Sequence, residues 1–263
     1  CTAHELAALG AHVVLVGRKP ERLAAVVAEI IEDGGAASSE VCDIREEARV
    51  VACVQAIVAA RGRIDALVNN AGGQFPSPLA LINQKGFETV VRTNLIGGFL
   101  FARECFTQSL REHGGAIVNI VADFWNGMPG MGHSGAARAG MDNFTKTAAL
   151  EWAAAGVRVN AVAPGWVASS GLDTYEGPVK QMIPKLREAV PLKRLATEAE
   201  ISAGIVFLLS EAAAFITGET LKIDGGAPLF SALWPSPDHD RSQPFQGFHR
   251  ASTPKVLERV EDR

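Results

Sequence analysis

The chain has 263 residues, of which 48% are hydrophobic, 21% charged and 6% aromatic, and its net charge is -4 at pH 7. These values are typical of one globular domain and exclude a collagen, a disulfide-rich scaffold and a globally disordered chain. The excess of acidic residues argues against a nucleic-acid-binding protein, because basic side chains are needed to neutralise phosphates.

The cysteine pattern favours a reducing compartment. The four cysteines, Cys1, Cys42, Cys53 and Cys105, form no C-x-x-C pair, which argues against a zinc site, and no metal is predicted. Residues 1–10 lack the basic start and apolar run of a signal peptide. No apolar run reaches the length of roughly 18 residues that a membrane span needs. We therefore expect a cytoplasmic protein without a membrane span.

Short apolar runs alternate with segments of helical spacing along the chain. We predict strands at 12–16, 37–42, 64–68, 116–121, 157–162 and 220–223, and helices at 20–31, 45–60, 87–111, 134–155 and 198–210. The helix over 87–111 is expected to break near Gly97-Gly98. Strand runs without polar alternation, separated by helices, indicate a parallel sheet covered on both faces, hence an α/β doubly wound fold. Ligands of such folds bind beyond the carboxyl ends of the strands.

The last 36 residues differ from the rest. Five of the 13 prolines lie in residues 228–263, among polar residues. We predict a single domain over residues 1–227 and a loosely ordered tail over 228–263, with a short helix within 255–261.

Several short motifs occur in a fixed order along residues 1–227. They are Asn69-Asn70-Ala71-Gly72, Thr93-Asn94-Leu95, Asn160-Ala161-Val162-Ala163-Pro164-Gly165, Ile216-Thr217-Gly218-Glu219 and Asp224-Gly225-Gly226. Together they resemble the classical short-chain dehydrogenase/reductase family. The resemblance implies a Rossmann-type fold, a nicotinamide dinucleotide, hydride transfer and a homo-oligomer, either a dimer or a tetramer.

The start of the chain departs from that family. The family opens with a strand and a glycine-rich turn that holds the pyrophosphate, whereas residues 1–10 read as the helix that should follow. In the strand order 3-2-1-4-5-6 the missing strand would lie in mid-sheet. The strand at 12–16 would then lack a partner toward 64–68, and its exposed backbone groups would be costly. We expect the working protein to carry an additional N-terminal segment.

The residues after the first predicted strand favour NADP over NAD. An acidic residue at this position would bind the ribose of NAD, whereas a cation accommodates the 2′-phosphate of NADP. The sequence there is Gly17-Arg18-Lys19, with no acid before Glu21. The forked guanidinium of Arg18 suits a phosphate. The alternative is a solvated start of the next helix.

Other cofactor contacts follow from the resemblance. Asp43 and Ile44 match the contact to adenine, although Asp43 could also be the N-cap of the helix at 45–60. The loop along the adenosine ribose corresponds to Asn70, Ala71 and Gly72, although Gly72 could be a simple turn residue. At the nicotinamide end, the resemblance indicates Pro164, Gly165, Val167 and Ser169.

The expected catalytic residues are altered. The family carries a Ser, a Tyr-x-x-x-Lys motif and an upstream Asn. In this sequence Ser134 occupies the Tyr position and Arg138 the Lys position. The usual Ser is replaced by an apolar residue, whereas the Asn is kept as Asn94. A serine hydroxyl is too weak an acid to replace a tuned phenol. Arg138 can bind ribose hydroxyls but cannot release a proton.

Two branches of the family resemble this pattern. The helix start from His133 to Gly140 is similar to peroxisomal trans-2-enoyl-CoA reductases and to dienoyl-CoA reductases, in which Ser134 and Asn94 would stabilise an enolate oxygen. The segment from Trp125 to Ser134 is similar to bacterial citronellol/citronellal dehydrogenases. Alcohol oxidation needs a general base, for which Asp123 and His133 are the candidates; alternatively they are a turn carboxylate and a helix-entry residue.

The flanking segments favour a lipophilic substrate. Phe124, Trp125, Met128 and Met131 form an apolar loop, and residues 171–188 read as a flap over the substrate. We predict an NADP-dependent oxidoreductase acting on an acyclic terpenoid alcohol or aldehyde. One alternative is an enoyl-CoA reductase using a CoA thioester. A second, from another class, is a non-catalytic dinucleotide-binding protein.

Overall fold

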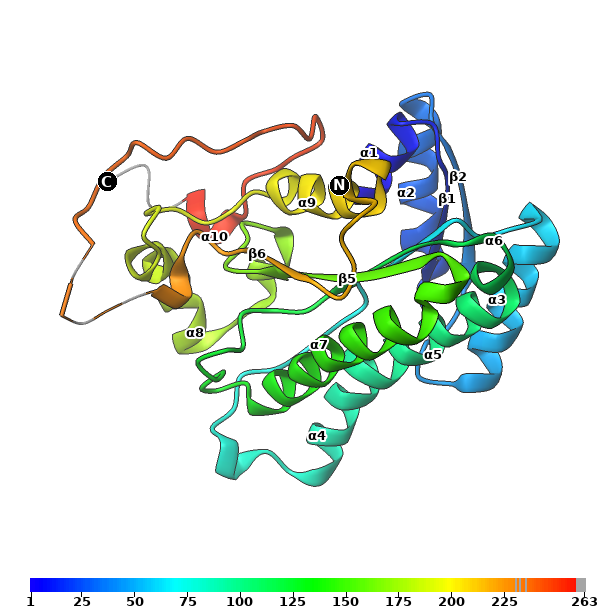
Figure 1. The fold of residues 1–263 in the computed structure, drawn as a ribbon. Helices are drawn as coiled ribbons and strands as arrows, with labels where there is room; N and C mark the ends of the chain where they lie inside the picture. The colour runs from blue at the N-terminus through cyan, green and yellow to red at the C-terminus, as the bar shows by residue number, and fades with distance from the viewer. Residues whose placement is uncertain (230, 232, 235, 259–263) are drawn as a thin grey trace.

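In a computed structural model, the part of the chain that is described contains six strands, and each pairs in parallel with its neighbours (Figure 1). The structure describes residues 1–229, 231, 233, 234 and 236–258. The strands are β1 (His12–Gly17), β2 (Ala36–Val41), β3 (Ala66–Asn69), β4 (Gly115–Ile120), β5 (Val157–Pro164) and β6 (Thr220–Ile223). All six predicted strands are present, with bounds that differ from the prediction by at most two residues at either end.

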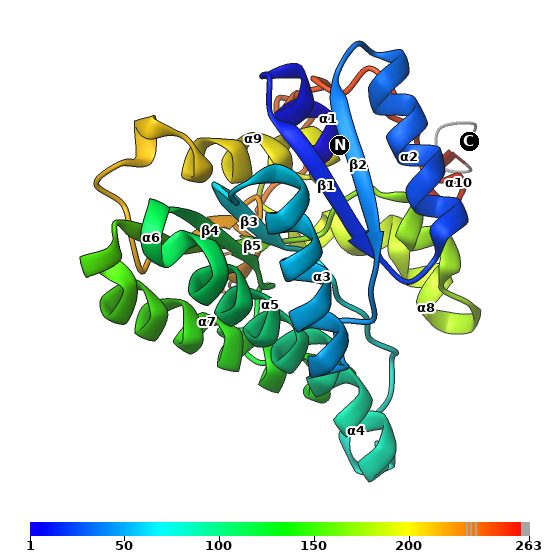
Figure 2. The same ribbon diagram turned by 90° about the vertical axis from the view of Figure 1, so that its right-hand side faces the viewer.

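Helices cover both faces of the strands (Figure 2). On one face lie α3 (Glu47–Arg61), α5 (Gly97–Cys105) and α7 (Gly132–Trp152), and on the other α1 (Thr2–Ala8), α2 (Pro20–Glu32) and α9 (Glu198–Leu209). The remaining helices are α4 (Gln84–Val91), α6 (Arg111–His113), α8 (Gly177–Met182) and α10 (Lys255–Glu258). This arrangement is the doubly wound, Rossmann-type fold that the sequence predicts. No described helix is long and apolar enough to cross a membrane.

The strands form two sheets rather than one. β1 pairs only with β2, while a second sheet has the order β3-β4-β5-β6. Among the described residues no strand lies between β1 and β3. The expectation that β1 lacks a partner toward β3 is confirmed, and the single continuous sheet is replaced by two. The additional N-terminal segment stays a prediction.

The predicted helix break at Gly97-Gly98 is wrong. The chain remains helical from α4 to α6, with π-helical turns at Arg92–Ile96 and Phe106–Leu110. A Cβ on Gly97 would lie 2.6 Å from Ile44, and one on Gly98 2.6 Å from Met141. The two glycines therefore allow close packing and do not end the helix.

Buried polar side chains connect the sheet to α7. Asn69 donates a hydrogen bond of 2.9 Å to Asn119 Oδ1, and Asn119 donates one of 2.9 Å to Thr145 Oγ1. Asn119 and Thr145 are fully buried. Because buried amides are costly when unpaired, this chain of hydrogen bonds favours one relative placement of β3, β4 and α7.

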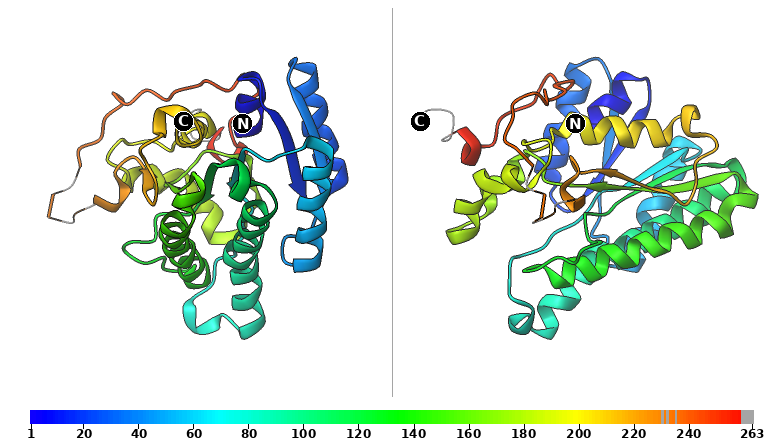
Figure 3. Two further views of the ribbon diagram at one scale, coloured as in Figure 1. Left: turned by 45° about the vertical axis from the view of Figure 1, so that its right-hand side comes forward. Right: turned by 60° about the vertical axis from the view of Figure 1, so that its left-hand side comes forward.

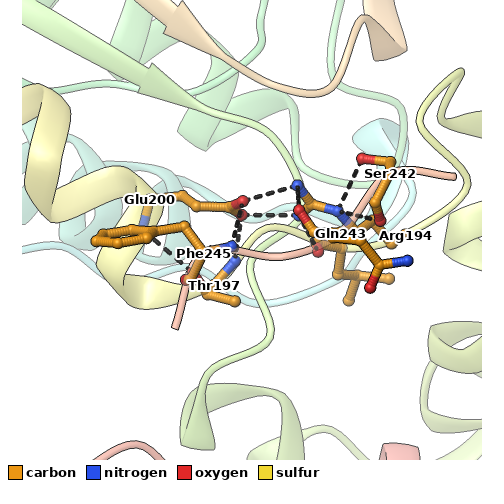
Figure 4. A network of polar contacts seen from close by, with 7 residues as sticks. Arg194, Thr197, Glu200, Ser242, Gln243 and Phe245 are labelled. Atoms are coloured by element: carbon orange, nitrogen blue, oxygen red, sulfur yellow. Dashed lines mark hydrogen bonds and ion pairs between the residues drawn. The ribbon is translucent and has the colours of Figure 1, made fainter. Parts of the chain in front are cut away.

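The C-terminal segment crosses the outside of the domain with little regular structure (Figure 3). Its short helix, α10, falls within the predicted range, of which residues 259–261 lie outside the described residues. Arg194 connects the C-terminal segment to the rest of the domain (Figure 4). Its guanidinium binds both carboxylate oxygens of Glu200 at 2.7 Å and the Ser242 hydroxyl at 3.0 Å. Further along, Arg250 forms an ion pair of 2.7 Å with Asp33.

Candidate active site

Three of the predicted catalytic side chains meet near the carboxyl ends of β3 and β4. Asn94 lies in the π-helical turn between α4 and α5, and Ser134 and Arg138 lie one turn apart at the start of α7. All three are buried, with exposed fractions of 2%, 1% and 8%. A π-helical turn inside an α-helix frequently marks a functional position, because the extra residue redirects a side chain.

Asn94 and Ser134 are in direct contact. Asn94 Nδ2 donates to Ser134 Oγ over 3.3 Å, and Asn94 Oδ1 accepts a hydrogen bond of 2.8 Å from the Gly73 backbone amide. The Gly73 contact orients the Asn94 amide so that its NH2 group faces the serine. Asn94 thus donates to the serine oxygen, which leaves the Ser134 hydroxyl proton available for a further acceptor such as a substrate oxygen.

Arg138 is a buried cation with spare hydrogen-bonding capacity. Its Nη1 donates to the Ile120 carbonyl oxygen, and its Nε has no partner within the part of the chain that the structure describes. Burial lowers the pKa of Arg138 to about 10, so the side chain still carries a charge at neutral pH. A Cβ on Gly72 would lie 2.4 Å from Arg138 Nη2, so a larger residue at this position would have to displace the guanidinium.

The two candidate bases differ in environment. The His133 ring is fully buried and edge-on to Phe75 at 4.5 Å, and its Nδ1 accepts a hydrogen bond of 2.8 Å from the Ser134 backbone amide. That placement at the first turn of α7 matches the helix-entry alternative. Asp123 is half-buried in the loop after β4, where burial and then the charge of Asp224 raise the pKa of its carboxyl.

The apolar loop after Asp123 is attached to β6. Phe124 and Trp125 stack with ring centres 4.3 Å apart, and Lys222 Nζ lies 4.0 Å from the centre of the Trp125 ring. Asn126 donates a hydrogen bond of 3.1 Å to the Pro228 carbonyl oxygen. The loop therefore presents aromatic side chains held by contacts to the strand that ends beside it.

The residues predicted to contact the adenosine part of the cofactor are two exposed cations, Arg18 and Lys19, and a carboxylate, Asp43, that is paired with Arg45. Arg18 and Lys19 are exposed beyond β1, and neither forms an ion pair among the described residues. Asp43 is bound at 2.8 and 3.1 Å by Arg45 Nε, and this guanidinium lowers the pKa of Asp43 to about 2. The N-cap alternative for Asp43 is wrong, because α3 begins at Glu47 and the N-cap position is Glu46.

The other predicted cofactor residues lie in loops at the same edge. Ile44 packs against Gly97, and Asn70 and Ala71 are exposed after β3. Pro164 ends β5, and the Gly165 amide donates 3.0 Å to the Ile223 carbonyl oxygen. Val167 forms a bridge with Ala196, and the Ser169 amide donates 2.9 Å to the Val167 carbonyl oxygen. The structure thus places these residues at the edge where the fold binds ligands, without direct contact to Ser134.

Sequence reasoning missed two residues of this region. Gln74 Oε1 lies 3.5 Å from Ser134 Oγ, and Asp224 acts on the pKa of Asp123. Gln74 stands in the motif after β3, but its contact to a residue 60 positions away has no signal in the sequence. The Asp224-Gly225-Gly226 motif indicates the family, but nothing in it indicates that Asp224 lies near Asp123.

Comparison with known proteins identifies the family. A family model described as enoyl-(acyl carrier protein) reductase matches residues 1–228. The chain belongs to the short-chain dehydrogenase/reductase family. Among solved structures, it is similar to a citronellol catabolism dehydrogenase of Pseudomonas aeruginosa PAO1, with 64% identity, a TM-score of 0.78 and coverage of 86% of this chain and 88% of that chain.

Further members of the short-chain dehydrogenase/reductase family resemble the chain more distantly. The peroxisomal 2,4-dienoyl-CoA reductase of Danio rerio is 32% identical over 85% of this chain and 75% of that protein. A 3-oxoacyl-[acyl-carrier-protein] reductase of Synechocystis is 38% identical over 87% and 92%. An actinorhodin polyketide ketoreductase solved with NADPH has a TM-score of 0.81 at 30% identity, over 87% of this chain and 92% of that chain. The chain is therefore an oxidoreductase of this family.

Proposed function

We propose that this oxidoreductase transfers a hydride between NADP(H) and an acyclic terpenoid alcohol or aldehyde of the citronellol/citronellal type. The observation that carries the proposal is the 64% identity to a citronellol catabolism dehydrogenase. The three further relatives described above are 30–38% identical and have names that refer to other substrates. The geometry of the site is compatible with the proposed reaction, as the following contacts indicate.

Several described residues fit a nicotinamide dinucleotide. The Nε of Arg138 has no hydrogen-bond partner among the described residues, and Gly72, which has no side chain, lies beside the guanidinium. The guanidinium can therefore donate hydrogen bonds to the hydroxyls of a ribose. Arg18 and Lys19 suit the 2′-phosphate of NADP, and NAD is the less favoured cofactor. When bound, the nicotinamide ring accepts or supplies the hydride.

The side chains near Ser134 would hold the substrate oxygen. Asn94 donates to the Ser134 oxygen and so orients the serine, whose hydroxyl would donate a hydrogen bond to an aldehyde or alkoxide oxygen. Asp123 is the favoured proton acceptor, because it lies half-buried in the loop after β4, where burial raises the pKa of its carboxyl. His133 is the second candidate, although its ring is packed against Phe75.

The apolar loop suits the hydrocarbon part of the substrate. Phe124 and Trp125 are stacked, and Met128 lies against the start of α7 near Gly135. Each methylene buried against such a surface contributes about 0.8 kcal/mol, so a ten-carbon chain would gain several kcal/mol.

We also propose a homo-oligomer.

A trans-2-enoyl-CoA reductase is the second candidate. The relative from Danio rerio is named as a dienoyl-CoA reductase, and Ser134 and Asn94 could equally hold the oxygen of a thioester. Conjugate reduction does not require the base that alcohol oxidation needs. The non-catalytic alternative predicts cofactor binding without turnover.

A parallel turnover assay tests these proposals. The absorbance of reduced nicotinamide would be followed for the full-length protein with NADP(H) and with NAD(H), using citronellol, citronellal and a medium-chain trans-2-enoyl-CoA. We expect turnover of both terpenoids, faster with NADP(H). Turnover of the thioester alone would establish the second candidate, and binding of NADPH without turnover of any of the three would support the non-catalytic protein.

A further inference from the structure

The hydroxyl of Ser134 lies between two amides. On one side Asn94 Nδ2 approaches to 3.3 Å, and on the other the Ser134 hydroxyl donates to Gln74 Oε1 over 3.5 Å. Gln74 follows Gly73, whose backbone amide fixes the orientation of Asn94 through a hydrogen bond of 2.8 Å. Two successive residues of the loop after β3 thus contact the two polar side chains of the site.

The contacts of Asn94, Ser134 and Gln74, which form a row of three side chains, assign each of them a donor or an acceptor role. Because Asn94 Oδ1 is occupied by the Gly73 amide, only its NH2 group can face Ser134, and the serine oxygen must accept. A hydroxyl has a single proton, so that of Ser134 is directed to Gln74 Oε1. A length of 3.5 Å exceeds the usual 2.5–3.0 Å for O–H···O contacts, so Gln74 is the partner that a ligand oxygen displaces most easily.

Gln74 is also the accessible member of the row. Its residue is exposed, whereas Asn94 and Ser134 are 2% and 1% exposed. Its carboxamide bears one acceptor oxygen and two N–H donors, and rotation about its last side-chain bond exchanges them. It can therefore accept from an alcohol O–H or donate to a carbonyl oxygen, the two redox forms of one substrate oxygen.

We propose that Gln74 is a substrate-orienting residue that binds the alcohol or carbonyl oxygen of the substrate beside Ser134. The identity of the substrate rests on the proposed function above. In the complex the substrate oxygen accepts the hydrogen bond that the Ser134 hydroxyl donates to Gln74 Oε1 when no substrate is bound. The freed carboxamide then turns its oxygen to an alcohol or its NH2 group to an aldehyde. No covalent bond changes in this exchange.

The test compares ligands that differ only in the oxygen. Affinities of the full-length protein would be measured by calorimetry for citronellol with NADPH and for citronellal with NADP, two combinations that cannot react. The reference ligand is 2,6-dimethyl-2-octene, the hydrocarbon of the same skeleton. For the wild type we expect both oxygenated ligands to bind more tightly than the hydrocarbon.

Two variants separate the roles of Gln74. Gln74→Ala should reduce the preference for the oxygenated ligands by about 3- to 10-fold, the value of a neutral hydrogen bond, with unchanged affinity for NADPH and for the hydrocarbon. Gln74→Glu has no N–H donor, so it should retain the preference for citronellol and reduce that for citronellal to the same extent as Gln74→Ala. Gln84→Ala is the matched control, because the exposed side chain of Gln84 bonds, among the described residues, only to Glu88.

The outcomes are distinguishable from those of the turnover assay. A Gln74-dependent preference without turnover supports the inference and contradicts the proposed reaction. Turnover together with a preference that Gln74→Ala leaves unchanged overturns the inference and preserves the reaction. Equal losses for the hydrocarbon and the alcohol would indicate a structural role and overturn the inference, as would a wild type that does not distinguish the oxygen.

Discussion

Asn94 Nδ2 lies 3.3 Å from Ser134 Oγ, although the two residues are 40 positions apart. The contact joins the π-helical turn before α5 to the first turn of α7, and both residues are buried. Burial strengthens hydrogen bonds from this pair to a ligand oxygen, since little water competes for the donors. The pair is therefore the part of the site on which the proposed reaction depends most.

Ser134→Ala should lower turnover by about 10²–10³-fold, the usual effect of removing a donor to a developing oxyanion. The affinity for NADPH should remain unchanged, because the hydroxyl faces Asn94 and Gln74. Steady-state kinetics and fluorescence titration with NADPH measure the two quantities. Ser77→Ala is the control, because within the described part of the chain the Ser77 hydroxyl donates only to the Pro78 carbonyl oxygen. Unchanged turnover in Ser134→Ala would remove Ser134 from the chemistry.

Arg138→Ala should weaken binding of NADPH by about 10- to 100-fold, as expected for loss of hydrogen bonds from a charged donor. Arg138→Lys keeps the charge and should recover part of the affinity. The thermal midpoint of both variants must be followed as well, because the Ile120 carbonyl oxygen loses its side-chain donor. If Arg138→Ala is folded and binds NADPH as the wild type does, the ribose role is wrong.

Arg18→Asp should reduce the ratio of kcat/KM for NADP to that for NAD by at least about 10-fold, because a carboxylate repels the 2′-phosphate and can bind a ribose hydroxyl. Arg22→Asp makes the same charge change on the exposed surface of α2 and should leave the ratio near its original value. Equal ratios in the two variants would count against the predicted cofactor preference.

Asp43→Asn should remove an acid-sensitive part of the folding stability. Arg45 lowers the pKa of Asp43 from 3.8 to about 2, so the pair contributes fully above pH 3.8 and its contribution is lost as the pH falls toward 2. The shift corresponds to at most about 2 kcal/mol at neutral pH, and solvent screening reduces this value. Urea unfolding at pH 7 and pH 3 gives the comparison. Asp65→Asn, in an exposed pair with Arg63, should show a difference below about 1 kcal/mol.

Arg194→Ala should destabilise the protein by about 1–3 kcal/mol and release the C-terminal segment. Glu200 is mostly buried, caps α9 together with Thr197 and accepts the Phe245 amide at 3.1 Å, so it would lose its counter-charge. Limited proteolysis should then cleave residues 237–250 faster than in the wild type. Arg187→Ala, whose pair with Asp238 has a length of 3.8 Å, should have a smaller effect. Equal cleavage in both variants would contradict the role of Arg194.

Much of the fold was predictable because strands and helices leave periodic patterns in the sequence. The break expected at Gly97-Gly98 failed for a physical reason: small residues permit both turns and close packing, and only the neighbours Ile44 and Met141 distinguish the two. Likewise, the sequence could not show whether the Asp43 carboxylate is free to bind a ligand, because its ion pair with Arg45 depends on how the two side chains are oriented.

The site residues that belong to sequence motifs of the family were predictable. Asn94, Ser134 and Arg138 were indicated by their motifs, and the structure brings them together. The contact of Gln74 with Ser134 depends on the path of the loop after β3, which no local pattern encodes. The burial of the His133 ring against Phe75 is a tertiary feature of the same kind.

The position of a transferred deuterium tests the central claim most directly. NADPH labelled with deuterium at the reactive carbon of its nicotinamide ring would be incubated with the full-length protein, citronellal and a medium-chain trans-2-enoyl-CoA together. Mass spectrometry would then locate the label in the products. The account predicts deuterium on C1 of citronellol. Deuterium only at Cβ of the saturated acyl thioester, with unlabelled citronellal recovered, would contradict it.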